Sequence, residues 1–277
     1  MQERLAMKTP DWSGSSGDIW ARRWRDTDRA LDGVGAALDE AILTAAPDGP
    51  FRALDVGCGP GTTTLALASS RPDAAIVGCD LSSPLIAIAE ERAAGLAGVR
   101  FVADDAEKAA LENGPFDLVF SRHGVMFFGD PQRAFASLRA ATASGGRMVF
   151  SCFRDWSANP WGSELALAVA GRDVPAPGRE PSGFAFAEPE YVRGILAGAG
   201  WAQAEPRPVD FDYLAGGPDE AIDFLAELGP AARLLEEMDD GEREAALQRM
   251  RAVIERHDRD GQVIFPGAVW IWTASAE

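Results

Sequence analysis

The sequence predicts an α/β protein organised around a doubly wound, mainly parallel sheet. Between residues 51 and 152, short apolar runs alternate with stretches that have the three-to-four spacing of an amphipathic helix. The first apolar run leads directly into closely spaced glycines and then into a helix-forming stretch, which indicates a strand, a tight turn and a helix N-terminus. Crossovers between parallel strands are right-handed, so the carboxyl ends of the strands are expected at one edge of the sheet.

A helical segment is expected ahead of this sheet. Apolar residues recur at spacings of three and four from Ile19 to Leu43, and the pattern stops near Pro47. Residues 1–17 are polar and aperiodic, and we expect them to be mobile unless a ligand orders them. Trp20 and Trp24 share one helix face. They either pack on the core or cover a bound molecule.

The first strand, which begins near Arg52, ends in a turn that contains glycines at positions 57, 59 and 61. Without Cβ atoms the backbone can bend sharply and approach a ligand closely, so the turn is predicted to seat a ligand. A dinucleotide-binding fingerprint has its third glycine one residue later, where this chain has Thr62. That difference weakens an interpretation as an NAD site.

Acidic or polar residues follow the next three strands, which are expected at 74–79, 99–103 and 116–120. Asp80 stands about twenty residues after the glycine turn, where a Rossmann-like site places the carboxylate that binds ribose hydroxyls. The alternative role for Asp80 is a helix N-cap. The residues that follow the other two strands are Asp104, Asp105 and Ala106, and Ser121, Arg122 and His123.

Later elements are expected to complete the sheet and to cover its active edge. A fifth strand is predicted at 147–152, a sixth at 205–213 and a final one at 263–273. Between the strands, 174–181 is rich in proline and predicts a loop, whereas 218–257 is an acidic helical stretch interrupted by glycines.

The glycine turn resembles motif I of the class I S-adenosylmethionine-dependent methyltransferases, whose D-x-G-x-G-x-G pattern it matches with Asp55, Gly57, Gly59 and Gly61. The runs 122–131 and 152–161 resemble a small-molecule, type-11-like subgroup. This resemblance implies a Rossmann-like seven-stranded sheet whose last strand is antiparallel. It also implies S-adenosylmethionine as cofactor and direct in-line transfer to an oxygen, nitrogen or carbon of a small molecule.

The resemblance divides the chain into a lid segment at 1–48 and a methyltransferase domain at 49–277, with substrate-cap insertions at about 153–200 and 218–257. It implies that Asp105, before Ala106, binds the adenine amino group, with Asp104 as the alternative. The full set of expected cofactor contacts is Asp55, Gly57, Cys58, Gly59, Gly61, Asp80, Leu81, Asp104, Asp105, Ala106, Ser121 and Arg122.

The acceptor is expected between the N-terminal helix, the loop after the fourth strand and the segment after the fifth strand. The aromatic residues there would form an apolar enclosure, and they are Trp20, Trp24, Phe127, Phe128, Trp156, Trp161, Phe184 and Phe186. His123 is the candidate general base, because a neutral imidazole titrates near neutrality. Its alternative role is packing against the cofactor.

Composition restricts the possible partners. The chain has 26 basic and 43 acidic residues, and its net charge of −17 repels phosphate backbones. A small-molecule substrate is therefore expected, with no nucleic acid. The sequence has no apolar stretch of about 18 residues and its N-terminus is polar, so a cytoplasmic protein without a membrane partner is expected, as a monomer or homodimer. The three cysteines are expected to be small buried hydrophobes, and their scattered positions suggest no metal site.

Two other functions remain open from the sequence. The chain could be a regulatory protein that binds the cofactor but has lost the transfer reaction. A weaker alternative is an NAD(P)-dependent oxidoreductase, which Thr62 and the lack of an obvious Tyr-x-x-x-Lys pair oppose.

Overall fold

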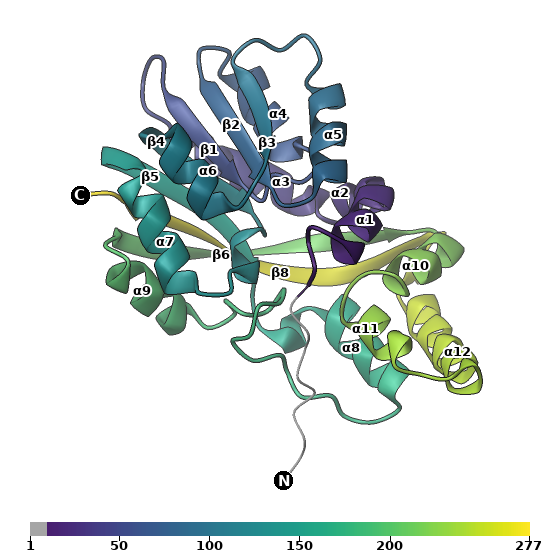
Figure 1. Ribbon diagram of the computed structural model, residues 1–277. Helices are drawn as coiled ribbons and strands as arrows, with labels where there is room; N and C mark the ends of the chain where they lie inside the picture. Colours follow the sequence, from purple (N-terminus) through teal and green to yellow (C-terminus); the bar gives the residue numbers. More distant parts are fainter. Residues whose placement is uncertain (1–9) are drawn as a thin grey trace.

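The computed structural model describes residues 10–277 and contains one twisted sheet with helices on both faces (Figure 1). The sheet order is β3-β2-β1-β4-β5-β8-β6. The first five strands are parallel, and β8 lies antiparallel between β5 and β6. Their bounds are β1 Arg52–Val56, β2 Ala75–Asp80, β3 Val99–Ala103, β4 Phe116–Arg122, β5 Thr142–Phe153, β6 Ala202–Gly216 and β8 Gln262–Ser275.

The predicted doubly wound sheet with an antiparallel last strand is confirmed. An additional two-residue strand, β7 (Asp258–Arg259), pairs with the start of β8 and was not expected. It forms because the chain reverses at Asp260 and Gly261, which both adopt positive φ. Strands β6 and β8 also extend beyond their expected ends, and they pair over most of their length.

Helices α3, α4 and α5 cover one face of the sheet, and α6, α7 and α9 cover the other (Figure 1). In the central strands residues facing both sides are buried, as in β1, where only Arg52 is exposed. The bounds are α3 Asp32–Ala45, α4 Thr62–Ser70, α5 Ser83–Arg92, α6 Ala106–Asn113, α7 Pro131–Ala140 and α9 Pro189–Gly198.

The N-terminal region forms three helices where the periodicity predicted one. They are α1 (Ser15–Arg22), α2 (Trp24–Ala30) and α3 (Asp32–Ala45), and they are separated at Arg23 and Leu31. Helix α1 packs against α5 and α2 packs against β6, so each break redirects the chain. Because α1 begins at Ser15, part of the stretch expected to be mobile is helical, whereas residues 1–9 of that prediction lie outside the described residues.

The two predicted cap segments meet in space. Helix α8 (Pro160–Ala170) packs against α11 (Pro230–Glu236) and α12 (Asp240–Arg256), below β8 in Figure 1. Helix α10 (Pro218–Leu225) joins α12 to β6. Two 3-10 turns, η1 (Val125–Phe127) and η2 (Trp156–Ala158), follow β4 and β5. Across residues 10–277, every helix is too short or too polar to cross a membrane.

Candidate active site

The glycine turn after β1 requires glycine for two different reasons. Gly57, Gly59 and Gly61 have φ values of 64°, 53° and 82°, in the left-handed region that favours glycine. A Cβ on Gly57 would lie 2.9 Å from the Cα of Gly124, so this residue allows the β1 and β4 ends to approach. A Cβ on Gly59 would have no atom of residues 10–277 within 4 Å. The backbone at Gly59 therefore faces open space in which a ligand can lie.

Asp80 binds the glycine turn directly. Its Oδ2 accepts the N–H of Gly59 and its Oδ1 accepts the N–H of Ser82, both at 2.9 Å. Burial raises the pKa of Asp80, and these two hydrogen bonds oppose the increase. The neighbouring Leu81 has 44% of its surface exposed, although it is apolar. Each oxygen of Asp80 retains a lone pair, so the carboxylate can fix the turn and still accept a hydroxyl.

Asp55 and Cys58 lie beneath the turn. Thr64 Oγ1 donates to Asp55 Oδ2 at 2.6 Å, whereas Oδ1 has no hydrogen-bond partner in the described chain. Burial raises the pKa of Asp55 to about 7. The Cys58 thiol packs in a small cluster with Phe101, and the Cys58 N–H donates to the carbonyl of Cys79. Both residues support the turn from within the protein.

The end of β3 lies beside the end of β2, because Ala103 pairs with Asp80 in the sheet register. Asp105 is the N-cap of α6 and accepts the N–H groups of Glu107 and Lys108. Asp104 pairs with the Lys108 ammonium at 2.6 Å, and this hydrogen bond lowers the pKa of Asp104. Asp105 thus combines a capping role with a position at the sheet edge, next to Ala106.

Ser121 and Arg122, at the end of β4, make contacts within the protein. Ser121 Oγ donates to the carbonyl of Val56 at 2.6 Å and accepts the N–H of Gly124 at 3.1 Å. It therefore joins the end of β4 to the end of β1. The Arg122 guanidinium forms an ion pair with Asp28 of α2.

His123 has an unusual conformation and an unusual environment. Its φ is 64°, although it is not glycine, and its surface is only 5% exposed. The Nδ1 atom lies 2.9 Å from Ser151 Oγ, and among residues 10–277 the Nε2 atom has no hydrogen-bond partner. Burial, aided by the charge of Arg122, lowers the pKa of His123 to about 3. The imidazole is therefore neutral at physiological pH.

Aromatic rings extend away from His123 as a connected row. The His123 ring lies 4.4 Å from that of Phe153, Phe153 lies 4.9 Å from Trp161, and Trp161 stacks on Tyr213 at 4.8 Å between centroids. Phe184 also stacks against Phe153 and Trp161. We call Phe153, Trp161, Phe184 and Tyr213 the aromatic row. Phe153 and Tyr213 were not among the predicted residues; Phe153 directly follows the predicted fifth strand, and Tyr213 ends the predicted sixth.

The other predicted aromatic residues are distributed over three further places. Trp156 meets Phe184 edge-on at 4.8 Å, beside the aromatic row. Phe128 and Phe186 both pack on Phe135 of α7, within the core. The N-terminal side holds the remaining three. Trp20 and Phe127 both contact Trp12, and the Trp24 ring contacts the guanidinium groups of Arg25 and Arg92.

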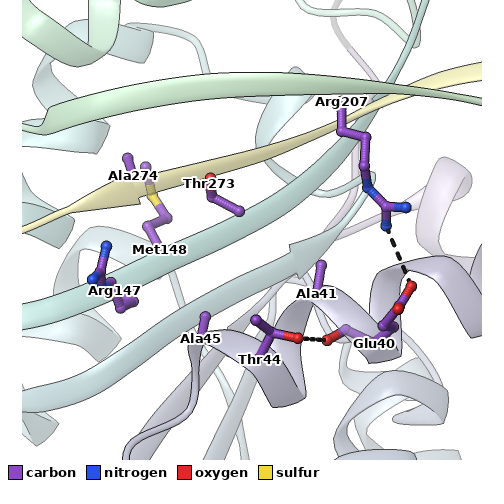
Figure 2. Close-up of a pocket in the computed structure, with 9 residues that line it drawn as sticks. All are labelled: Glu40, Ala41, Thr44, Ala45, Arg147, Met148, Arg207, Thr273 and Ala274. Carbon is purple, nitrogen blue, oxygen red and sulfur yellow. Dashed lines mark hydrogen bonds and ion pairs between the residues drawn. The ribbon is translucent and has the colours of Figure 1, made fainter.

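A separate hollow of about 510 Å³ lies away from this edge (Figure 2). It is bordered by α3 and by Arg147 and Met148, which pair with Leu118 and Val119 in the first part of β4, so it lies toward the amino ends of the parallel strands. In Figure 2 Arg207 extends from β6 toward Glu40, at 3.9 Å. The candidate residues described above are all outside its lining.

Comparisons with known proteins identify the family. A family model described as a methyltransferase domain matches residues 53–146, the segment that contains the glycine turn and the first four strand ends. The demethylmenaquinone methyltransferase of Thermus thermophilus is 32% identical over 65% of this chain and 81% of that protein. The chain belongs to the class I S-adenosylmethionine-dependent methyltransferases. It is an enzyme of this family, and S-adenosylmethionine is its cofactor.

Two further similarities agree with this assignment. The malonyl-[acyl-carrier protein] O-methyltransferase of Geobacter sulfurreducens is 35% identical, and the match covers 60% of this chain and about three fifths (61%) of that protein. The phosphoethanolamine N-methyltransferase 2 of Haemonchus contortus, solved with S-adenosyl-L-methionine, has the same fold with a TM-score of 0.57 and 18% identity. That match covers 98% of this chain and 60% of the other.

The residues at the carboxyl edge fit this cofactor. Open space lies over Gly59, the exposed Leu81 offers an apolar surface for a base, and Asp80 has free acceptor capacity. The individual contacts assigned to Asp80, Asp105 and the other residues stay predictions. Cys58 and Ser121 would act through the turn that they support, because their polar groups bind protein atoms. Asp55 binds Thr64 through Oδ2, whereas its buried Oδ1 has no hydrogen-bond partner in residues 10–277.

Proposed function

We propose that this methyltransferase acts on a small, mostly apolar acceptor whose hydroxyl group is oriented by His123. The observation that carries this proposal is the buried Nε2 atom of His123, which has no partner in residues 10–277 and lies at the end of β4. A buried polar atom without a partner costs about 1–3 kcal/mol, so it is expected to be satisfied when a ligand binds. An acceptor hydroxyl is the group that Nε2 would bind.

The protonation state of His123 favours a role as hydrogen-bond acceptor. Its low pKa keeps the ring neutral, so one nitrogen carries a proton and the other a lone pair. If Nδ1–H donates to Ser151 Oγ, the lone pair is on Nε2, the atom that has no partner in residues 10–277. Ser151 would thereby select the tautomer that can accept a hydrogen bond from a hydroxyl.

The cofactor supplies a methyl group bonded to a positively charged sulfur. In the proposed step a lone pair of the acceptor oxygen forms the new bond to the methyl carbon, and the electrons of the broken bond remain on sulfur. His123 Nε2 first accepts a hydrogen bond from the hydroxyl group. As methyl transfer makes the oxygen more acidic, Nε2 takes up the hydroxyl proton. Alignment of the reacting atoms supplies much of the remaining catalysis in such a displacement.

The aromatic row supports a flat, apolar acceptor. Its rings begin at Phe153, beside His123, and continue to Trp161 and Tyr213 at centroid distances below 5 Å. The Thermus relative is named for methylation of demethylmenaquinone, a quinone, whereas the Geobacter relative is named for malonyl-[acyl-carrier protein]. A flat ring suits the aromatic row better than a charged malonyl group, which the net charge of −17 would also disfavour.

The test compares His123→Gln with His257→Gln, the equivalent change at the chain's other histidine. His257 binds Glu164 at 3.0 Å beside α8 and serves as the control. Methyl transfer from S-adenosylmethionine is measured with a panel of phenols, hydroquinones, amines and carboxylic acids. We expect a hydroxyl acceptor and a fall in kcat of at least about 100-fold for His123→Gln, because proton handling contributes about 10²–10⁴-fold. Affinity for S-adenosylhomocysteine should stay within about twofold.

Three results would contradict the proposal. An unchanged kcat in His123→Gln would show that His123 takes no part in the methyl transfer. A strict preference for carboxylic acids or amines would reject the hydroxyl acceptor. Binding of S-adenosylhomocysteine without turnover on any of these acceptors would favour the regulatory protein that has lost transfer.

A further inference from the structure

Asp28 connects helix α2 to three elements of the cofactor-binding half. Its carboxylate forms an ion pair with Arg122 at the end of β4. It also accepts a hydrogen bond of 2.5 Å from Thr62 Oγ1, at the first position of α4, and lies 3.5 Å from the Arg92 guanidinium of α5. One side chain of the N-terminal region thus binds residues from β4, α4 and α5.

Arg92 extends this connection to the glycine turn itself. Its Nη1 donates to the carbonyl of Pro60 at 2.7 Å and to Thr62 Oγ1 at 2.8 Å. The same guanidinium lies 4.6 Å from the Trp24 ring centroid, so α2 contacts Arg92 through both Trp24 and Asp28. These contacts join residues 60–62 to α5 and α2.

The ion pairs of Asp28 are partly buried. Only 16% of the Asp28 side chain and 14% of the Arg122 side chain are exposed. Salt and water screen such pairs weakly. Removing the carboxylate would leave Arg92 and Arg122 without their shared counter-ion. Their mutual repulsion should then displace both side chains.

The helix before α2 covers the next part of the same edge. Gly17 of α1 is buried, and a Cβ on it would lie 2.8 Å from Ser82 Oγ. Ser82 is also the residue whose N–H binds Asp80. The Trp12 ring meets Phe127 edge-on at 4.7 Å. Residues 12–28 therefore contact the ends of β2 and β4 as well as the glycine turn.

We propose that Asp28 is a positioning residue that fastens helices α1 and α2 to the glycine turn and thereby retains the bound cofactor. It acts through Thr62, Arg92 and Arg122, and its carboxylate is fully engaged with these residues. When these contacts are lost, the turn loses its outer support and α1 separates more readily from Ser82. S-adenosylhomocysteine should then dissociate faster. This role is independent of His123 and of the identity of the acceptor.

The experiment compares Asp28→Asn with Asp26→Asn. Asp26 is a matched control because it lies on the same helix, is similarly exposed at 21%, and also pairs with two arginines, Arg23 and Arg29. Arg23 binds Glu227 and Arg29 binds the carbonyl of Ala215, and both of these partners lie outside the glycine turn. Calorimetry gives Kd for S-adenosylhomocysteine, stopped-flow tryptophan fluorescence gives its dissociation rate, and hydrogen exchange reports on residues 57–64.

For Asp28→Asn we expect Kd to rise about tenfold, mostly through faster dissociation, together with faster hydrogen exchange at 57–64. Asp26→Asn should keep Kd within about twofold. A merely structural role would lower the melting temperature of Asp28→Asn and leave Kd and the dissociation rate of the folded protein unchanged. That result, or an equal rise of Kd in both variants, would overturn the proposal.

If Asp28→Asn does not fold, a second pair of variants tests whether the contact between Asp28 and Thr62 supports cofactor binding. Thr62→Val removes the hydroxyl that Asp28 and Arg92 share, whereas Thr62→Ser keeps it. We expect Thr62→Val to bind S-adenosylhomocysteine about threefold to tenfold more weakly and Thr62→Ser to recover most of this loss. Equal affinities for the two Thr62 variants would reject the connection through Thr62.

Discussion

Replacement of Asp80 should weaken both the fold and cofactor binding, because its carboxylate holds two backbone N–H groups at 2.9 Å. A hydrogen bond to a charged group contributes about 1.5–3 kcal/mol. Asp80→Ala removes two of them, but it also removes the burial cost that raises the pKa of Asp80. We therefore expect the free energy of unfolding to fall by about 2 kcal/mol.

The effect on ligand binding should be larger than this loss of stability implies. Asp80→Ala frees the Gly59 N–H and removes the acceptor for a ribose hydroxyl, so we expect S-adenosylhomocysteine to bind about 10- to 100-fold more weakly, at about 1.4 kcal/mol for each factor of ten. Asp80→Asn keeps one acceptor oxygen and should lie between Ala and wild type.

Calorimetry with S-adenosylhomocysteine and urea unfolding without it separate the two effects of Asp80. Asp73→Asn is the control, because Asp73 precedes β2 at the opposite end and pairs with Arg71 near the surface. Wild-type affinity in Asp80→Ala, at a temperature where the variant is folded, would refute the assignment of Asp80 to the cofactor.

Two further predictions concern the turn and the buried histidine. Gly59→Val places a β-branched side chain in the space over the turn at a φ of 53°, so S-adenosylhomocysteine affinity should fall more than about 100-fold in calorimetry; a folded variant with normal affinity would place the cofactor elsewhere. His123 is protonated near pH 6.5 in the unfolded chain but only near pH 3 when folded, so it lowers stability as pH falls through that range. Relative to wild type, His123→Phe should gain stability as the pH falls below 6.5, with a slope that approaches about 1.4 kcal/mol per pH unit below about pH 5.5 in urea unfolding; a constant difference would mean that His123 titrates normally in the folded protein.

The sequence predicted the glycine turn and the strand ends because these features are local. Strand, glycines and helix follow one another within residues 52–70, and parallel strands must bring Asp80 and Ala103 to one edge. The antiparallel last strand followed from the resemblance to the family, whereas the sheet order is known only from the structure. Alternation of apolar residues could not show that one periodic stretch breaks at Arg23 and Leu31, because those breaks depend on contacts with α5 and β6.

The supporting residues of the site could not be found from sequence spacing. Ser151 reaches His123 because Arg122 pairs with Ser151 in the sheet register, a relation between residues far apart in the chain. Asp28 similarly meets Thr62 and Arg122 only after α2 has docked. The pattern of aromatic residues did not distinguish Trp161, in the aromatic row, from Phe186, which is buried against α7, because both stand in apolar surroundings.

The most direct test of the central claim is a crystal structure of this protein with S-adenosylhomocysteine. We predict that the ligand lies at the carboxyl edge of the sheet, over Gly59, with its ribose at Asp80 and its adenine beside Leu81 and Asp105. We also predict that its sulfur points toward His123. Binding in the hollow between α3 and β5, or anywhere other than over Gly59, would contradict the account.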